Sequence, residues 1–83
     1  MTKHKVRVVV TLKNGVLDPQ GLAIKHVIDN LGKAGFEEVR QGELFDLVVT
    51  AETPKAALAS AQDAAKTVLS NPILETFVCS LVS

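Results

Sequence analysis

The sequence predicts an α+β domain in which four strands and two helices follow one another in the order βαββαβ. Several segments alternate between apolar and polar residues with the period of a β-strand. Two others carry apolar residues at helical spacing, each just after a capping residue and a proline. The length of 83 residues allows one domain, which we take to span residues 1–83.

The first strand and the first helix are the most clearly marked elements. Residues 5–12 are rich in β-branched side chains that alternate with polar ones, and Asn14-Gly15 ends the strand. A helix then begins at Asp18-Pro19, because Asp caps free backbone amides and Pro fits the first helical position. Gly32 or Gly35 is expected to end it. The apolar side of this helix consists of Ile24, Val27, Ile28 and Leu31.

The middle of the chain is expected to form two strands joined by a tight turn. Phe36–Arg40 reads as a short second strand, Gln41-Gly42 as the turn, and Leu44–Ala51 as the third strand. The competing interpretation is a single bulged strand that passes through Gly42.

The last third of the chain predicts an alanine-rich helix and a final strand. Thr53-Pro54 repeats the capping pattern, and small side chains along the helix allow close approach to a sheet. Asn71-Pro72 ends the helix, because a residue before Pro avoids helical geometry. Residues 73–82 form the last strand. The order favours a ferredoxin-like layout, a four-stranded antiparallel sheet with both helices on one face.

The sheet face without helices is expected to mediate self-association. A chain of this length buries only about 63% of its unfolded surface as a monomer, and this face mixes valines and a leucine with a self-neutralising Arg-Asp pair. The alternative is that scattered surface valines are ordinary. The candidates for the self-association face are Arg7, Val9, Leu44, Asp46, Val48 and Val78.

Composition restricts the class of function. Nine Lys and Arg residues balance nine Asp and Glu residues, so the chain is a poor binder of nucleic acid or anionic membranes. With aromatics at 4% and no Tyr or Trp, the stacking platform of an RNA-binding sheet is missing. The single cysteine, Cys79, indicates a reducing compartment. With no targeting signal at the N-terminus, the expected location is cytoplasmic.

The chain shows no catalytic constellation. His4, His26 and Cys79 lack the spacing of metal ligands, and neither histidine is placed as a base for the cysteine. The segment before the first helix lacks the glycine spacing of phosphate-binding loops. Gly21 is unusual, because glycine in a first helical turn costs about 1 kcal/mol relative to alanine. It suggests close approach by another backbone, such as that of a partner chain.

The segment Leu12–Ile24, with the sequence LKNGVLDPQGLAI, closely resembles the PurS family, the small subunit of phosphoribosylformylglycinamidine (FGAM) synthase. Leu31-Gly32, Val39–Gly42 and Leu69–Glu75 fit the same pattern in the same order, so the resemblance spans essentially the whole chain. One departure is Glu43, where the family pattern has Lys after the glycine, which puts in doubt any contact that the lysine makes.

The resemblance implies a role in purine biosynthesis. Members of the PurS family form homodimers or homotetramers. They join a glutaminase, PurQ, to an ATP-dependent synthetase, PurL, which converts formylglycinamide ribonucleotide to FGAM. They are thought to assist the transfer of ammonia between the two. This implies that the chain alone has no catalytic activity and binds no cofactor, and that ATP and Mg²⁺ belong to the synthetase.

We expect the helix-entry loop and the turn near residue 41 to contact these partners, because their glycines and Arg40 are poorly explained by core packing. Arg40 suits a charge-assisted contact with a carboxylate. The partner-interface candidates are Lys13, Asn14, Gly15, Asp18, Gln20, Gly21, Arg40 and Gly42. The alternative function is an ACT-like regulatory module that binds a small metabolite at a subunit interface near Asn14-Gly15 and the first helix.

Overall fold

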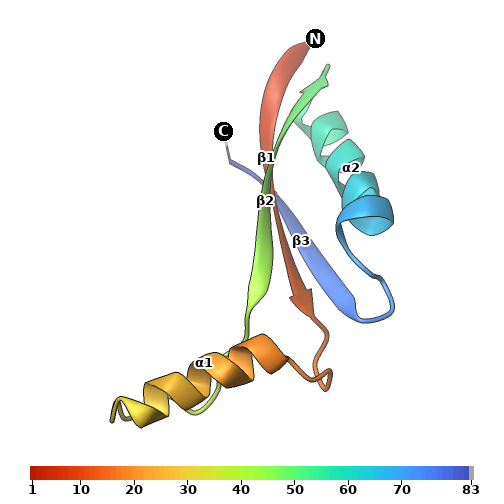
Figure 1. Cartoon of the computed structure of the whole chain (residues 1–83). Coiled ribbons are helices and arrows are strands. Elements are labelled where there is room, and N and C mark those ends of the chain that lie inside the picture. Colours follow the sequence, from red (N-terminus) through yellow and green to blue (C-terminus); the bar gives the residue numbers. More distant parts are fainter. Residues whose placement is uncertain (83) are drawn as a thin grey trace.

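The computed structural model describes residues 1–82 and contains a three-stranded antiparallel sheet in the order β2-β1-β3. The strands are β1 (Thr2–Leu12), β2 (Gly42–Ala51) and β3 (Glu75–Leu81). The helices are α1 (Pro19–Asn30) and α2 (Pro54–Ala64), and α2 continues into the π-helical turn η1 (Ala65–Leu69). The α+β class is confirmed, and β1 lies at the centre of the sheet (Figure 1).

Both helices begin where the sequence predicted. Asp18 accepts a hydrogen bond from the Gly21 amide at 2.9 Å, and Thr53 accepts one from the Ala56 amide at 3.0 Å. A proline follows each cap as the first helical residue. Of the two glycines predicted to end α1, Gly32 does so: the helix stops at Asn30, and Gly32 adopts a φ of 75°.

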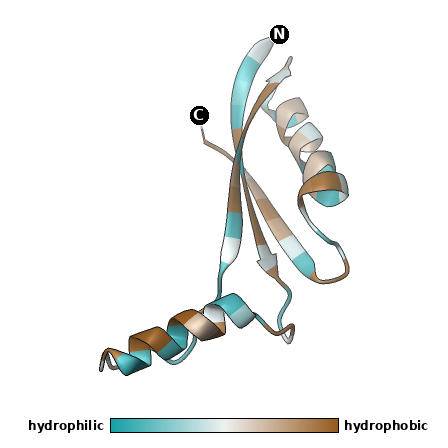
Figure 2. Cartoon of the chain, in the orientation of Figure 1, coloured by the Kyte–Doolittle hydropathy of each residue, from teal (hydrophilic) through white to brown (hydrophobic). Residues whose placement is uncertain are grey.

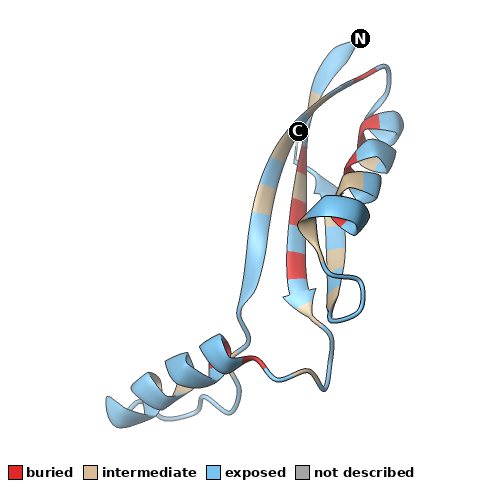
Figure 3. Ribbon diagram, turned by 45° about the vertical axis from the view of Figure 1, so that its right-hand side comes forward, coloured by how far each residue is buried: buried red, intermediate tan, exposed pale blue. Residues whose placement is uncertain are grey.

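The hydrophobic core lies between α2 and one face of the sheet. Three valines of β1 are fully buried against a row of small side chains spaced four residues apart on α2 and η1. Because alanines leave little bulk between backbones, the helix comes close to the strand. The core residues are Val6, Val8, Val10, Ala51, Ala57, Ala61 and Ala65. Figure 3 shows this burial concentrated on β1 and the inner side of α2.

The predicted four-stranded sheet is wrong for the single chain. Residues 36–40, expected to be a strand, pair with no described strand, and Gln41-Gly42 is not a hairpin turn because Gly42 already pairs with Thr11 as the first residue of β2. The competing interpretation, a single bulged strand that passes through Gly42, is wrong as well, because β2 begins at Gly42. The physical reason is that residues 36–40 lie against α1 instead of a strand.

The prediction that both helices cover one sheet face is also wrong. Only α2 packs on the strands, whereas α1 projects from the end of the sheet (Figure 1). Residues 31–41 run back alongside α1 to β2, and we call α1 with residues 31–41 the arm. The radius of gyration is 16.3 Å, against about 12 Å for a compact chain of this length. The arm explains the difference.

The apolar side of α1 is exposed as a result. Val27 and Leu31 retain 57% and 67% of their accessible surface, and Ile24 retains 41%. Figure 2 shows the brown apolar bands of α1 with no neighbouring element except the returning segment. An amphipathic helix normally buries its apolar stripe against another element. In the single chain, this stripe of α1 stays exposed.

Candidate functional site

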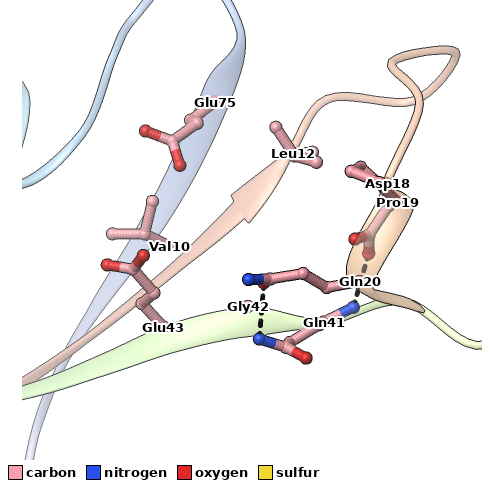
Figure 4. Close-up of a pocket in the computed structure, with 9 residues that line it drawn as sticks. All are labelled: Val10, Leu12, Asp18, Pro19, Gln20, Gln41, Gly42, Glu43 and Glu75. Atoms are coloured by element: carbon pink, nitrogen blue, oxygen red, sulfur yellow. Dashed lines mark hydrogen bonds between the residues drawn. The ribbon is translucent and has the colours of Figure 1, made fainter. Parts of the chain in front are cut away.

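The residues predicted to contact partners gather where the arm joins the sheet. We call the contact between α1's N-terminus, the loop before it and residues 39–42 the junction. Asp18 is its centre: one carboxylate oxygen accepts the Gly21 amide at 2.9 Å, and the other accepts the Gln41 amide at 2.6 Å. Asp18 is thus a helix cap and also a link between segments 23 residues apart. Figure 4 shows the second bond.

The electrostatics of Asp18 follow from these contacts. The Gly21 amide, and next the Gln41 amide, lower the pKa of this carboxyl below its ordinary value of 3.8, and nearby Arg40 lowers it further. Burial opposes the shift but does not cancel it. The carboxylate is therefore charged at neutral pH, and it is the one charged or polar residue in the buried class among residues 1–82.

Arg40 closes the other side of the junction from within the chain. Its guanidinium donates to the carbonyl oxygens of Val16 at 3.0 Å, Lys13 at 3.3 Å and Leu12 at 3.4 Å. The helix-entry loop is thereby clamped to the residue that precedes Gln41. The structure thus gives Arg40 an intrachain role, while its predicted contact with a partner carboxylate stays a prediction.

The two glycines of the junction are explained by close backbone approach. A β-carbon on Gly21 would overlap the carbonyl oxygen of Val39, and one on Gly42 would lie 2.7 Å from the carbonyl oxygen of Val10. The backbone that approaches Gly21 therefore belongs to the same chain. A methyl group at position 21 would push the returning segment away from α1.

The remaining partner-interface candidates form the rim of the junction. Gln20 accepts a hydrogen bond from the side-chain amide of Gln41 at 2.7 Å (Figure 4). Lys13, Asn14 and Gly15 are exposed in the loop, where Gly15 adopts a φ of 86°. The structure therefore places all eight candidates at or beside the junction, although their contact with partners stays a prediction.

Gln41 belongs to the junction, although the sequence pattern predicts it only as part of a turn. Its backbone and side chain both bind across the junction, to Asp18 and Gln20. The sequence does indicate that Asp18 has a spare hydrogen-bond acceptor, because a carboxylate has two oxygens and an N-cap commonly uses one. Only the tertiary structure shows which distant amide donates to the second oxygen.

The junction borders a small cavity of about 210 Å³ on the helix-covered side of the sheet. Figure 4 shows Glu43 of β2 and Glu75 of β3 on either side of Val10 at its wall. The residue that departs from the family pattern, Glu43, thus lines this cavity together with the carboxylates of Asp18 and Glu75. The described residues 1–82 contain no group of three or more His, Cys, Asp or Glu side chains positioned to hold a metal ion.

The predicted self-association face lies on the open side of the sheet. The strand register aligns Leu44, Val9 and Val78 in one row across all three strands. The next row pairs Arg7 with Asp46, whose guanidinium and carboxylate meet at 2.9 Å and 3.2 Å. Val48 and Val78 retain 66% and 67% of their accessible surface. The face therefore carries exposed apolar side chains and an ion pair whose two charges cancel, and no helix covers it. Its role in self-association stays a prediction.

Cys79 lies on the opposite face, packed half-buried against the core. Burial raises the pKa of its thiol above the ordinary value of 9.0. A protonated thiol is a weak nucleophile, so this position fits core packing. No helix among residues 1–82 has the length and apolar character needed to cross a membrane.

Comparison with known proteins identifies what this fold and junction resemble. The model of the PurS family, described as phosphoribosylformylglycinamidine (FGAM) synthase, matches residues 5–83. The FGAM synthase subunit PurS of Synechocystis is 37% identical over 76 residues, which cover 89% of this chain and 74% of that protein. The PurS subunit of Mycobacterium leprae is 37% identical over 66 residues, 80% of each chain.

Solved structures agree with the sequence matches. PurS in the PurLQS structure from Thermotoga maritima superposes with a TM-score of 0.90 at 26% identity, covering 99% of this chain and 100% of that one. PurS of Methanocaldococcus jannaschii, a subunit of formylglycinamide ribonucleotide amidotransferase, gives a TM-score of 0.84 at 25% identity over 96% and 95% of the two chains.

Proposed function

The chain belongs to the PurS family, and it is a small subunit of FGAM synthase in purine biosynthesis; from this premise we propose that it joins a PurL-type synthetase to a PurQ-type glutaminase. The Thermotoga maritima PurLQS structure, in which a similar chain occurs with those subunits, supports the proposal. The assembled enzyme converts formylglycinamide ribonucleotide, ATP, glutamine and water to FGAM, ADP, phosphate and glutamate.

The observation that carries a joining role is the amount of apolar surface that the single chain leaves exposed. Its accessible surface is 5912 Å², about 1,100 Å² above that of a compact monomer of this mass. The excess comes with two exposed apolar surfaces, the side of α1 and the open sheet face. Surfaces of this kind mark sites of protein association.

The chemistry of the complex explains why such a subunit needs no reactive groups. Ammonia released at the glutaminase must reach the synthetase without being protonated or lost to water. A subunit that seals and aligns the space between two active sites serves this purpose by excluding water. The junction suits this role, because its hydrogen bonds fix the angle between the arm and the sheet.

The open sheet face is proposed to pair with a second copy of the chain. The exposed row of Leu44, Val9 and Val78 supports the proposal, and the Arg7–Asp46 pair would enter the interface already neutralised. The test is Val48→Glu, with Ala59→Glu on the exposed side of α2 as the control. Light scattering should show dissociation for the first variant alone. Equal dissociation, or none, would remove this face from the interface.

ATP and Mg²⁺ are proposed to bind the synthetase and not this chain, and the complex is proposed to work in the cytoplasm.

The alternative function, a regulatory module that binds a small metabolite, is not favoured. The cavity at the junction, of about 210 Å³, and a second one of about 200 Å³ between α1 and residues 37–40 are smaller than the roughly 300–1,000 Å³ of ordinary ligand pockets.

The test of the joining role is reconstitution. The chain should co-purify with a PurL-type and a PurQ-type subunit, and FGAM formation from glutamine should require it. FGAM formation from added ammonium salt, which bypasses the glutaminase, should depend on it less. Arg40→Ala should weaken assembly, with Lys55→Ala on α2 as the control. Full glutamine-dependent turnover in the absence of this chain would overturn the proposal.

A further inference from the structure

We propose that Asn14-Gly15, in the loop between β1 and α1, is a site of spontaneous deamidation, and that the isoaspartate formed there loosens the junction. The backbone nitrogen of Gly15 attacks the side-chain carbonyl carbon of Asn14. Ammonia leaves with the proton of that nitrogen, and a five-membered succinimide remains. Water then opens the ring at one of its two carbonyls, which gives aspartate or isoaspartate. The reaction stands without the proposed function, and only its effect on assembly rests on that function.

The nucleophile of this reaction is free at Asn14. The Gly15 amide donates no backbone–backbone hydrogen bond within the described residues 1–82. Both residues are exposed, and a β-carbon on Gly15 would meet no atom within 4 Å. Because glycine has no side chain, nothing at residue 15 itself hinders the approach of its nitrogen to the asparagine. The space around the loop also accommodates the ring that forms.

The other two asparagines of the chain lack a free nucleophile. Asn71 is followed by Pro72, and proline has no backbone N–H to give up when a succinimide forms. Asn30 is followed by Leu31, whose amide donates to a carbonyl oxygen one turn earlier in α1 at 3.0 Å. An attack there must break this hydrogen bond and rotate the last residue of the helix. The structure thus distinguishes Asn14 from both of the others.

The turn that contains Asn14 opens at low cost. It is closed by the Val16 amide, which donates to the carbonyl oxygen of Lys13 at 3.1 Å. Exposed loop segments with few hydrogen bonds open with a free energy near zero. Gly15 already adopts a φ of 86°, in a region that glycine enters freely. Rotation of the Asn14 backbone, which brings the Gly15 nitrogen to the side chain, is therefore accessible in the folded chain.

Isoaspartate at position 14 would lengthen the loop that Arg40 holds. Its main chain runs through the side-chain carboxyl carbon and so gains one atom. The Arg40 guanidinium donates to the carbonyl oxygens of Leu12 and Lys13 before this position and to that of Val16 after it. A planar guanidinium has a fixed spacing of donors, so it loses contacts when the spacing of the acceptors grows. The ordinary aspartate product keeps the original spacing and should keep the clamp.

Peptide mapping by mass spectrometry tests the reaction. In the folded chain, incubated in mildly alkaline buffer, conversion at Asn14 should be at least about tenfold faster than at Asn30, the factor expected from one additional hydrogen bond to break. Asn71 should stay intact. Asn14→Gln should abolish the fast conversion, because glutamine has to close a six-membered ring. Conversion at Asn14 that is absent, or no faster than at Asn30, would overturn the proposal.

The effect on the junction is measured on the purified isoaspartate form, identified by labelling with an isoaspartyl methyltransferase. The matched control is Asn14→Asp, which carries the same added charge without the added backbone atom. Urea unfolding should show lower stability for the isoaspartate form than for Asn14→Asp. The difference should shrink in an Arg40→Ala background, where the clamp is already lost. Equal stabilities, or a difference that Arg40→Ala leaves unchanged, would contradict a loosened junction.

Assembly with a PurL-type and a PurQ-type subunit is measured separately by co-purification. The isoaspartate form should assemble less completely than Asn14→Asp. An isoaspartate form that unfolds more easily but assembles fully would overturn the effect on assembly and leave the reaction in place. If the unmodified chain itself fails to co-purify, the proposed function falls while the deamidation result stands.

Discussion

The carboxylate of Asp18 accepts the backbone amide of Gln41 at 2.6 Å and so fixes the base of the arm to the start of β2. The same side chain caps α1 through Gly21. One residue therefore sets both where the helix begins and where the chain re-enters the sheet.

Replacing Asp18 should cost more than replacing an ordinary helix cap. Asp18→Ala removes the cap, worth about 1 kcal/mol, and leaves the Gln41 amide without its partner, which adds about 1 kcal/mol or more. Thr53→Ala is the matched control, because Thr53 caps α2 through Ala56 alone. Urea unfolding measures both changes. Equal losses of stability would mean that the bond to Gln41 contributes nothing.

Stability should fall in acid because of Asp18. Its folded-state pKa lies below the ordinary 3.8, so its stabilisation is fully present above the unfolded pKa and is lost as the pH drops through the folded-state value. Urea unfolding between pH 2 and pH 7 should show this loss below about pH 4, and Asp18→Asn should flatten it.

The control for this pH profile is Asp46→Asn. The pKa of Asp46 is also lowered, first by its hydrogen bond to Arg7, but the pair is about 40% exposed. Solvent screening makes such pairs weak, so its removal should leave most of the acid dependence in place. A profile that changes more for Asp46→Asn than for Asp18→Asn would contradict the central role of Asp18.

Enlarging Gly21 should separate the returning segment from α1. Gly21→Val introduces atoms that overlap the Val39 carbonyl, a clash that typically costs about 1–3 kcal/mol. Ala23→Val adds a similar branched side chain at an exposed position on the same helix and should cost less than about 1 kcal/mol. Thermal unfolding and assembly with the partners provide the two readouts. Indistinguishable variants would show that the contact is easily relaxed.

Cys79 should react slowly. Its pKa is raised by burial, so little thiolate exists at neutral pH and alkylation by iodoacetamide should lag behind that of a free cysteine. The rate should rise with pH and should rise sharply in urea. Rapid alkylation of the folded chain at pH 7 would mean that the thiol is more accessible than its contacts with the core indicate.

Local patterns in the sequence were sufficient for much of this fold. The alternation along residues 5–12 predicted a strand with two different faces, and register and exposure confirm that Val9, Leu44, Val48 and Val78 lie on the open face. Asp18-Pro19 and Thr53-Pro54 marked both helix starts. These features depend on neighbours in the chain, and for that reason the sequence alone predicts them.

Only the tertiary structure decided what the apolar side of α1 and residues 36–40 pack against. The sequence determined that α1 has an apolar side and that residues 36–40 suit a strand, but periodicity does not state whether the same chain or another covers that side. The second oxygen of Asp18, the clamp of Arg40 and the contact of Gly21 with Val39 hold the arm away from its own sheet. These contacts join residues about 20 or more positions apart, so only packing in three dimensions selects them.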